Sequence, residues 1–160
     1  MPQKTVLLAE DDPGHVAMFR RAIDDSGIAC RLEVVHDGTG VIDYLFSLGA
    51  YKESLPREMP SLLLLDLNMP NMGGLQVLQV LRRVRGEDRV RFPPVVVLTS
   101  SESDGDVENA YRWGAQSYIR KPDNFDDFAS AVCETLHYWL GLNRVAPPHR
   151  AEMHYVHEGL

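Results

Sequence analysis

Residues 62–74 read LLLLDLNMPNMGG, and this stretch decides the fold class of the chain. Four consecutive leucines are typical of a strand that is covered on both faces of a parallel sheet. Asp66 follows the leucines directly and therefore lies at the carboxyl end of that strand. The Met-Pro pair at 69–70 and the Gly-Gly pair at 73–74 fit a turn that lets a helix begin close to Asp66.

Comparable apolar runs occur on either side of this stretch, at 6–9, 32–35 and 95–98, with a shorter one at 117–119. Between the runs, apolar residues recur at helical spacing. The alternation predicts a strand–helix unit that is repeated five times. The predicted fold class is therefore α/β, with a five-stranded parallel, doubly wound sheet and helices on both of its faces.

Short polar side chains indicate where the later helices begin. Ser103, with Asp106 three residues further on, is typical of a helix N-cap. Asp123, followed by Asp126 at the same spacing, predicts a second such cap before the last helix. Between the second and third apolar runs the pattern is weaker and predicts a helix over 41–48.

The composition indicates one globular domain: 160 residues, 44% hydrophobic and 24% charged. The periodic pattern stops after Gly141, so we expect a domain over 1–141 and a tail or dimerisation arm over 142–160. The net charge of -7 argues against binding to nucleic acid or to an anionic membrane surface. Because we find no signal peptide or membrane-spanning run, and expect Cys30 and Cys133 to be buried free thiols, we predict a cytoplasmic protein.

Polar side chains follow four of the five predicted strands. The carboxyl ends of neighbouring parallel strands meet at one edge of such a sheet. We therefore expect one pocket in which several carboxylates, a hydroxyl group and an ammonium group come together. The residues concerned are Glu10, Asp11 and Asp12 after the first strand, Asp66 after the third, Thr99 at the end of the fourth and Lys121 after the fifth.

Several carboxylates in one pocket cannot all be ionised without a compensating cation. Oxygen ligands of this kind suit Mg²⁺, which prefers about six oxygens and keeps several waters. Asp66 then has two alternative roles, as a metal ligand or as a nucleophile toward a phosphoryl group that the metal and Lys121 neutralise. An acid at a strand end is otherwise most often a helix cap, but four polar strand ends together favour the functional interpretation.

Four motifs, in this order, carry a resemblance to a known family: LLAEDDP, LLLLDLNMPNMGG, VVVLTSS and YIRKP. Over roughly residues 4–141 the chain resembles the receiver domain of two-component response regulators. The resemblance implies the flavodoxin-like receiver fold, (βα)5, and a signalling phosphoacceptor without a DNA-binding output domain, not an enzyme. The long second loop, the KPDNFDDF sequence and the YWL sequence of the last helix resemble the regulators partnered with phytochrome-type histidine kinases.

The resemblance also assigns roles to the positions around the acceptor. Asp66 would accept the phosphoryl group from a kinase phosphohistidine. Asp11 would bind Mg²⁺ directly, Glu10 would bind it through water, and the backbone carbonyl of Asn68 would supply a further ligand. We prefer Glu10 and Asp11 as the acidic pair, although Asp11 and Asp12 form an alternative pair that stays open.

The remaining assignments concern the response to phosphorylation. Thr99 would hydrogen-bond to the phosphoryl oxygens, and Lys121 would neutralise another of them. Tyr118, three residues before Lys121, would be the aromatic switch residue, which rotates when the loop after the fourth strand is drawn inward. Without the resemblance, Tyr118 would be an ordinary half-buried aromatic residue. The peptide bond before Pro122 is usually cis in this family, a state that is rare outside X–Pro bonds.

Three alternatives from other classes have to be weighed. A Mg²⁺-dependent aspartyl phosphohydrolase usually carries a second acid two residues after the nucleophile, where this chain has Asn68. A flavodoxin-like cofactor binder needs a phosphate-binding loop after the first strand, where this chain has three acids. An unphosphorylated receiver-fold scaffold would not need the complete set of Asp66, Thr99 and Lys121.

The last helix predicts a protein partner. Residues 138–140, YWL, together with Leu142 offer more apolar surface than one helix face can bury. Large exposed apolar patches mark interaction sites. We therefore expect a homodimer through the last helix and the tail.

Overall fold

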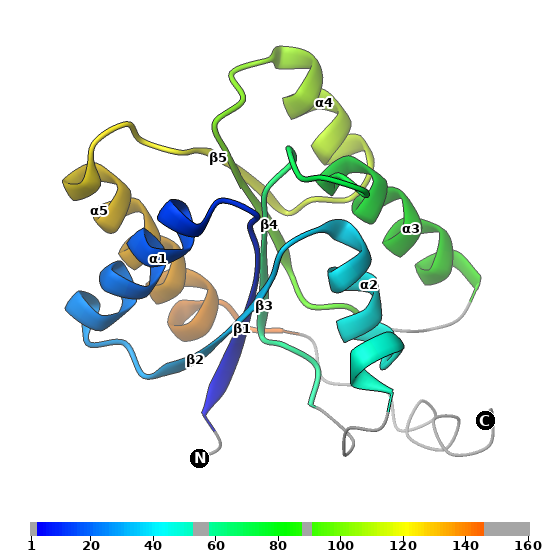
Figure 1. Cartoon of the computed structure of the whole chain (residues 1–160), viewed down its shortest axis with the longest axis horizontal. Coiled ribbons are helices and arrows are strands. Elements are labelled where there is room, and N and C mark those ends of the chain that lie inside the picture. The colour runs from blue at the N-terminus through cyan, green and yellow to red at the C-terminus, as the bar shows by residue number, and fades with distance from the viewer. Residues whose placement is uncertain (1–2, 53–57, 88–90, 146–160) are drawn as a thin grey trace.

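A computed structural model describes residues 3–52, 58–87 and 91–145 of the chain (Figure 1). In this part of the chain, five parallel strands form one sheet in the order β2-β1-β3-β4-β5. The predicted α/β class and the five-stranded doubly wound sheet are confirmed. The strands are β1 (Lys4–Ala9), β2 (Cys30–Val35), β3 (Leu62–Leu65), β4 (Val95–Thr99) and β5 (Ser117–Arg120). The helices are α1 (Pro13–Ser26), α2 (Gly38–Phe46), η1 (Gly49–Tyr51), α3 (Gly74–Glu87), α4 (Asp104–Arg112), α5 (Phe125–Leu136) and η2 (His137–Leu142).

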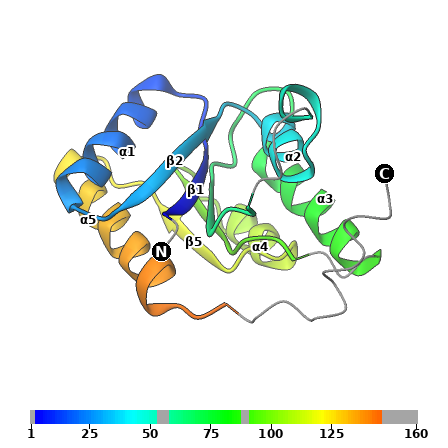
Figure 2. The same cartoon turned by 90° about the horizontal axis from the view of Figure 1, so that it is seen from below.

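Helices cover both faces of the sheet. Figures 1 and 2 show α1 and α5 together on one face, and α2, α3 and α4 on the other. Successive residues of a strand point to opposite faces, so Leu7 belongs to the core under α2 and α3, whereas Leu8 belongs to the core under α1 and α5. The same alternation buries every residue of 62–65 and 95–98. This burial on both faces explains why these strands are uninterrupted apolar runs in the sequence.

The start of α5 differs from the sequence-based expectation. Its N-cap is Asn124, whose side chain accepts a hydrogen bond from the backbone N–H of Asp127 at 2.9 Å. The prediction of Asp123 as the cap is therefore wrong. The Asp123 carboxylate is exposed and lies 3.7 Å from the guanidinium of Arg120, so the helix begins one residue later than the acid spacing suggested.

The N-cap predicted for α4 is confirmed, whereas α2 begins earlier than expected. Ser103 Oγ accepts a hydrogen bond from the backbone N–H of Asp106 at 3.4 Å. Asp37 caps α2 by accepting a hydrogen bond from the backbone N–H of Gly40 at 2.8 Å, and the helix starts at Gly38. The first turn of α2 contains no large apolar residue, so hydrophobic periodicity does not detect it.

Gly74, the first residue of α3, allows the helix to begin against the end of β3. A Cβ atom at Gly74 would lie 2.3 Å from the carbonyl oxygen of Asp66 and 2.9 Å from the Cα of Leu67. Both are backbone atoms, which cannot move aside as the tip of a side chain can. The glycine pair thus allows α3 to begin close to Asp66, as the sequence predicted.

We expect Gly74→Ala to lower the free energy of unfolding by about 1–2 kcal/mol, because the backbone after β3 has to shift. Gly105→Ala in α4 is the matched control, since its Cβ would meet only Ser103 Oγ, at 3.5 Å. Replacing this helical glycine should raise the stability by about 0.5–1 kcal/mol. Urea denaturation measures both changes. A Gly74→Ala variant as stable as the wild-type protein would contradict the close approach.

The end of the last helix is partly apolar and exposed, as expected. After α5 the chain continues through the π-helical turn η2 (His137–Leu142), in which Leu140 is buried against the core. Tyr138 is half exposed and Leu142 is 77% exposed. Beyond position 145 the predicted tail lies outside the described residues.

The two cysteines are free thiols, as predicted, but they are not buried. Cys30 opens the edge strand β2 and Cys133 lies in α5, and both are half-buried. Cys30 lies on a strand that has a neighbour on one side only, and Cys133 is followed by the exposed Glu134. Within the described ranges, no helix is both long enough and apolar enough to cross a membrane.

Candidate functional site

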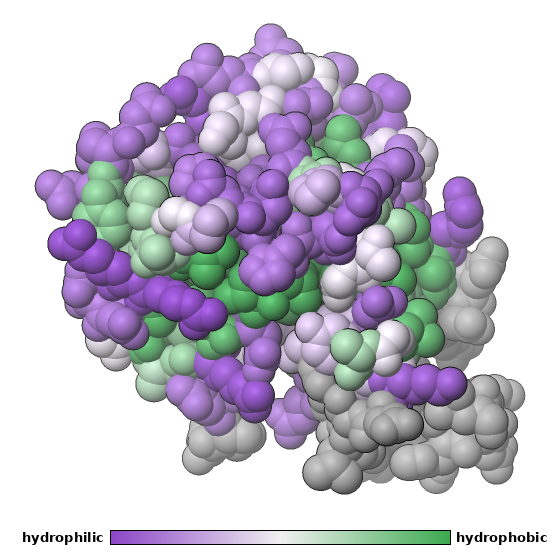
Figure 3. Space-filling view, in the orientation of Figure 1, coloured by the Kyte–Doolittle hydropathy of each residue, from purple (hydrophilic) through white to green (hydrophobic). Residues whose placement is uncertain are grey.

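The sheet order brings the predicted strand-end residues together. β1 and β3 are paired neighbours, so Glu10 and Asp66, which follow their last residues, leave the sheet side by side. β4, on the other side of β3, ends with Thr99, whose carbonyl accepts the backbone N–H of Lys121 at 2.8 Å. The strands end at the upper edge of the sheet in Figure 1, and hydrophilic side chains dominate this part of the surface in Figure 3.

Lys121 lies at the centre of this site. Its Nζ donates hydrogen bonds to Glu10 Oε2 at 2.5 Å and to Asp66 Oδ2 at 2.9 Å. Lys121, Glu10 and Asp66 are exposed by only 5%, 1% and 7%. Two carboxylates with so little access to water repel each other, and the ammonium group between them offsets that repulsion.

Glu10, Asp11 and Asp66 form the acidic cluster that the sequence predicted. One carboxylate oxygen of each lies within 4.8 Å of the others. Glu10 and Asp66 are buried whereas Asp11 is exposed, so the cluster is open to solvent on the Asp11 side. A compact set of oxygen donors with an open side fits a hard divalent cation that keeps part of its water shell.

Asp12, the third acid of the triplet, has a different function. Its side chain accepts hydrogen bonds from the backbone N–H groups of Gly14 and His15, at 2.7 and 3.2 Å, and thereby caps α1. The same two hydrogen bonds lower the pKa of the Asp12 carboxyl. Of the two registers that the sequence left open, the geometry therefore favours Glu10 and Asp11 as the acidic pair.

The two buried carboxyls are shifted in opposite directions. Burial raises the pKa of Glu10, and the hydrogen bond and charge of Lys121 oppose this only in part. Burial also acts to raise the pKa of Asp66, but the hydrogen bonds from Lys121 and Thr99 outweigh it, and the pKa is lowered overall. Asp66 is therefore ionised at neutral pH, which is the state that a nucleophilic carboxylate requires.

The loop between β4 and α4 is linked to both the acidic site and β5. Thr99 is completely buried, and its side chain contributes to the lowered pKa of Asp66. Ser101 donates its backbone N–H to Thr99 Oγ1 at 3.4 Å, and its carbonyl accepts the hydroxyl of Tyr118 at 3.0 Å. Burial raises the pKa of the Tyr118 phenol, so this group is a neutral donor. The Tyr118 side chain is half-buried, and its role as the switch residue stays a prediction.

His15 also lies at the site, although no motif in the sequence pointed to it. Its Nδ1 lies 3.0 Å from Lys121 Nζ and 3.6 Å from Glu10 Oε1, at the partly exposed rim of the site. The available signal was its place in the first turn of α1, three residues after the capping Asp12. A helix that begins at the site carries the side chains of its first turn into that site.

Two expectations from the resemblance concern the backbone. Asn68 donates its N–H to Asp66 Oδ1 at 3.3 Å, which turns the β3–α3 loop toward the acceptor; the role of its carbonyl as a metal ligand stays a prediction. The expected cis bond before Pro122 is wrong, because the described residues contain no cis peptide bond. The trans form of a peptide bond is more stable than the cis form even before proline. With a trans Lys121–Pro122 bond, the Lys121 side chain reaches both Glu10 and Asp66.

A doubly wound parallel sheet with an acidic cluster, a buried lysine and a hydroxyl at its strand ends defines the receiver class of two-component signalling proteins. The chain belongs to the response regulator receiver domain family, whose model matches residues 6–133. The resemblance stated from the four motifs is thereby confirmed.

Two curated relatives are similar over most of their length. The chain is 39% identical over 143 residues to the probable methanogenesis regulatory protein FilR2 of Methanothrix harundinacea, covering 89% of this chain and 88% of FilR2. It is 33% identical over 139 residues to the response regulator Rcp1 of Synechocystis sp., covering 87% of this chain and 90% of Rcp1.

Solved structures extend the comparison. The phosphorylated cyanobacterial phytochrome response regulator RcpA superposes with a TM-score of 0.79 at 27% identity, covering 91% of this chain and all of RcpA. The Mn²⁺-bound form of Rcp1 superposes with a TM-score of 0.77 at 31% identity, covering 90% and 99% of the two chains. The relatives thus include a phytochrome response regulator, as the sequence resemblance indicated.

Proposed function

We propose that this chain is a phosphoacceptor response regulator in which Asp66 receives a phosphoryl group from the phosphohistidine of a histidine kinase. The observation that carries the proposal is the Asp66 carboxylate itself, which is buried and ionised, bonded to Lys121 and clustered with the acidic pair Glu10 and Asp11. The phosphorylated state of RcpA supports the same chemistry at this fold.

The proposed phosphoryl transfer involves Asp66 as the nucleophile, with Lys121 and Thr99 binding the phosphoryl oxygens. An oxygen of Asp66 attacks phosphorus, the P–N bond to the donor imidazole breaks, and its electron pair leaves with the imidazole. Lys121 exchanges its contact with the acceptor carboxylate for one with a phosphoryl oxygen. The buried hydroxyl of Thr99 donates to another phosphoryl oxygen.

The cofactor in this proposal is Mg²⁺. Glu10, Asp11 and Asp66, with the backbone carbonyl of Asn68, would hold it, and their all-oxygen donor set fits this ion. When bound, Mg²⁺ neutralises charge between the acceptor and the phosphoryl group. The Mn²⁺ in the Rcp1 structure supports a divalent cation at this fold.

Thr99 and Tyr118 are proposed as the switch residues. Phosphorylation adds about 1.5 to 2 negative charges, which attract the Thr99 hydroxyl and with it the β4–α4 loop. The Tyr118 hydroxyl is bonded to the Ser101 carbonyl in that loop, so movement of the loop breaks this bond and frees the ring to rotate. The face formed by α4, β5 and α5 would change shape and report the phosphorylated state.

The proposal is tested by the intact mass of the protein after incubation with Mg²⁺ and a small phosphodonor such as acetyl phosphate. We expect a gain of one phosphoryl group, and no gain without the metal or in Asp66→Asn. Asp11→Asn is expected to reduce the gain strongly. A mass gain that persists in Asp66→Asn would assign the acceptor elsewhere, and no gain with any donor would favour the scaffold alternative.

The partner and location belong to the same proposal. We propose a sensor histidine kinase of the phytochrome type as the phosphodonor, supported by the similarity to RcpA. The free thiols of Cys30 and Cys133 support a reducing, cytoplasmic location. We also retain the division into a receiver domain over 1–141 and a tail over 142–160.

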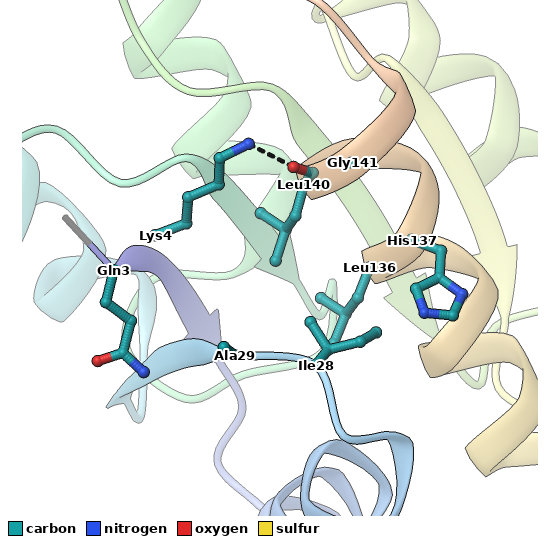
Figure 4. Close-up of a pocket in the computed structure, with 8 residues that line it drawn as sticks. All are labelled: Gln3, Lys4, Ile28, Ala29, Leu136, His137, Leu140 and Gly141. Atoms are coloured by element: carbon teal, nitrogen blue, oxygen red, sulfur yellow. Dashed lines mark hydrogen bonds between the residues drawn. The ribbon is translucent and has the colours of Figure 1, made fainter. Parts of the chain in front are cut away.

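We further propose that the protein forms a homodimer through its last helix and tail. Tyr138, Leu142 and Val145 are among the exposed large apolar side chains of the described residues, and they follow one another closely. A cavity of about 520 Å³ lies between the start of β1 and the end of α5. Figure 4 shows Leu136 and Leu140 on its wall. Such a surface favours a protein interface.

Sedimentation velocity at micromolar concentration is expected to show a dimer for the wild-type protein. Leu142→Gln should shift it toward monomer, because a 77% exposed leucine contributes to the proposed interface and not to the fold. Leu48→Gln, at another exposed leucine, is the control and should sediment as the wild type does. A wild-type monomer, with or without a phosphoryl analogue, would contradict the dimer.

A further inference from the structure

Residues 36–38, at the junction of β2 and α2, contact both loops that carry the acidic site. His36 Nδ1 lies 3.3 Å from the carbonyl oxygen of Glu10, in the loop after β1. Asp37 Oδ2 accepts the side-chain amide of Asn71 at 2.8 Å, and the backbone N–H of Gly38 donates to the carbonyl of Met72 at 2.8 Å. The last two contacts reach the loop after β3.

The two carboxylate oxygens of Asp37 accept hydrogen bonds from two different donors. Its Oδ1 accepts the N–H of Gly40 and caps α2, whereas its Oδ2 binds Asn71 outside the helix. The hydrogen bond from Asn71 is also the main reason that the pKa of Asp37 is lowered. Capping alone would need only one of the two oxygens.

Residues 36–38 and the β3–α3 loop pack closely against each other. A Cβ atom at Gly38 would lie 2.6 Å from the Met72 carbonyl oxygen and 2.7 Å from Val77 Cγ2. Asn71 has a φ of 61°, in the left-handed region that asparagine tolerates better than most residues. The β3–α3 loop is therefore held at Asn71 and Met72, a few residues after the acceptor.

We infer that Asp37 is a positioning residue that, through Asn71, holds the β3–α3 loop in place so that Asp66 and the Asn68 carbonyl face Glu10 and Asp11. The inference rests on the proposed function, because it concerns the metal site assigned there. Mg²⁺ demands nearly ideal octahedral geometry. Outer contacts that orient metal ligands are typically worth about 10- to 100-fold in affinity.

Two variants remove the Asp37–Asn71 hydrogen bond and spare the backbone. Asp37→Ser keeps a side-chain oxygen that caps α2 but has no second acceptor that could bind the Asn71 amide. Asn71→Gly removes the partner and keeps the left-handed backbone at no strain. The exchanged variant, Asp37→Asn with Asn71→Asp, restores the hydrogen bond in the reverse direction and preserves the net charge.

The experiment measures Mg²⁺ and Mn²⁺ affinity by isothermal titration calorimetry, together with amide hydrogen exchange at Gly38 in the metal-free protein. We expect both single variants to bind about tenfold more weakly or worse. Exchange at Gly38 should be faster in both. The exchanged variant should recover affinity and protection. Gly27→Ala, which strains the end of α1 at a φ of 69° far from the site, is the control for lost stability and should bind as the wild type does.

Single variants that bind the metals as tightly as the wild type would overturn this inference and leave the proposed metal site standing. So would an exchanged variant that stays as weak as the single ones. A wild-type protein that binds neither metal would overturn the proposed metal site and this inference together. The two failures are therefore distinguishable.

Discussion

Lys121→Met is expected to lower the free energy of unfolding of the metal-free protein by about 3–5 kcal/mol at neutral pH. The ammonium group lies 2.5 Å from Glu10 and 2.9 Å from Asp66, and all three side chains are buried. Its removal leaves two carboxylates close together with neither water nor a cation to compensate them. Chemical denaturation in a chelating buffer measures the loss.

Mg²⁺ should recover more stability in Lys121→Met than in the wild-type protein. The lysine and the metal both compensate the same carboxylates, and a ligand stabilises the folded state according to its affinity for that state. Lys4→Met is the matched control, because the Lys4 ammonium group donates a hydrogen bond to the Leu140 carbonyl at the other end of the sheet. If both lysine variants lose the same stability, Lys121 does not compensate a buried acidic pair.

Glu10→Gln is expected to raise the free energy of unfolding of the metal-free protein near neutral pH. The pKa of Glu10 is raised by burial, so the folded protein binds this proton more tightly than the unfolded chain does. The stability linked to Glu10 is therefore complete below its unfolded pKa of about 4.3 and is lost as the pH rises through the folded value. The amide of glutamine carries no charge and avoids that loss.

The gain from Glu10→Gln should shrink as the pH falls toward about 4, where glutamate in the folded protein is already protonated. Asp66 has a lowered pKa, so its contribution behaves in the opposite way: it is present above about pH 4 and is lost below that. In millimolar Mg²⁺ the order of stabilities should reverse, because Glu10→Gln weakens the metal site by about 10- to 100-fold.

Chemical denaturation of Glu10→Gln and the wild-type protein at neutral pH and at about pH 4 provides the test, and Glu102→Gln is an exposed control. The Glu102 side chain is 67% exposed, and its replacement should change stability by less than about 0.5 kcal/mol at either pH. A Glu10→Gln variant that is less stable than the wild type at neutral pH without metal would show that the charge of Glu10 stabilises the fold.

Much of the fold could be predicted because each signal is local. Two-sided burial makes β3 and β4 uninterrupted apolar runs, and the residue after each run lies at a strand end by definition. The incorrectly predicted starts of α5 and α2 also have local causes. Asp123 and Asn124 are both acceptable caps, and the choice depends on where the chain leaves β5. The first turn of α2 contains no apolar residue from which to recognise it.

Local sequence patterns suffice to predict the strand–helix alternation, the polar residues at the strand ends and the family of the protein. The division of those residues between functions depends on tertiary contacts. Asp11 joins the acidic cluster and Asp12 caps a helix, although they are adjacent in the chain. Lys121 reaches Glu10 across 111 positions because β1, β3, β4 and β5 lie in that order. Contacts of this range depend on strand order and register, which no local pattern encodes.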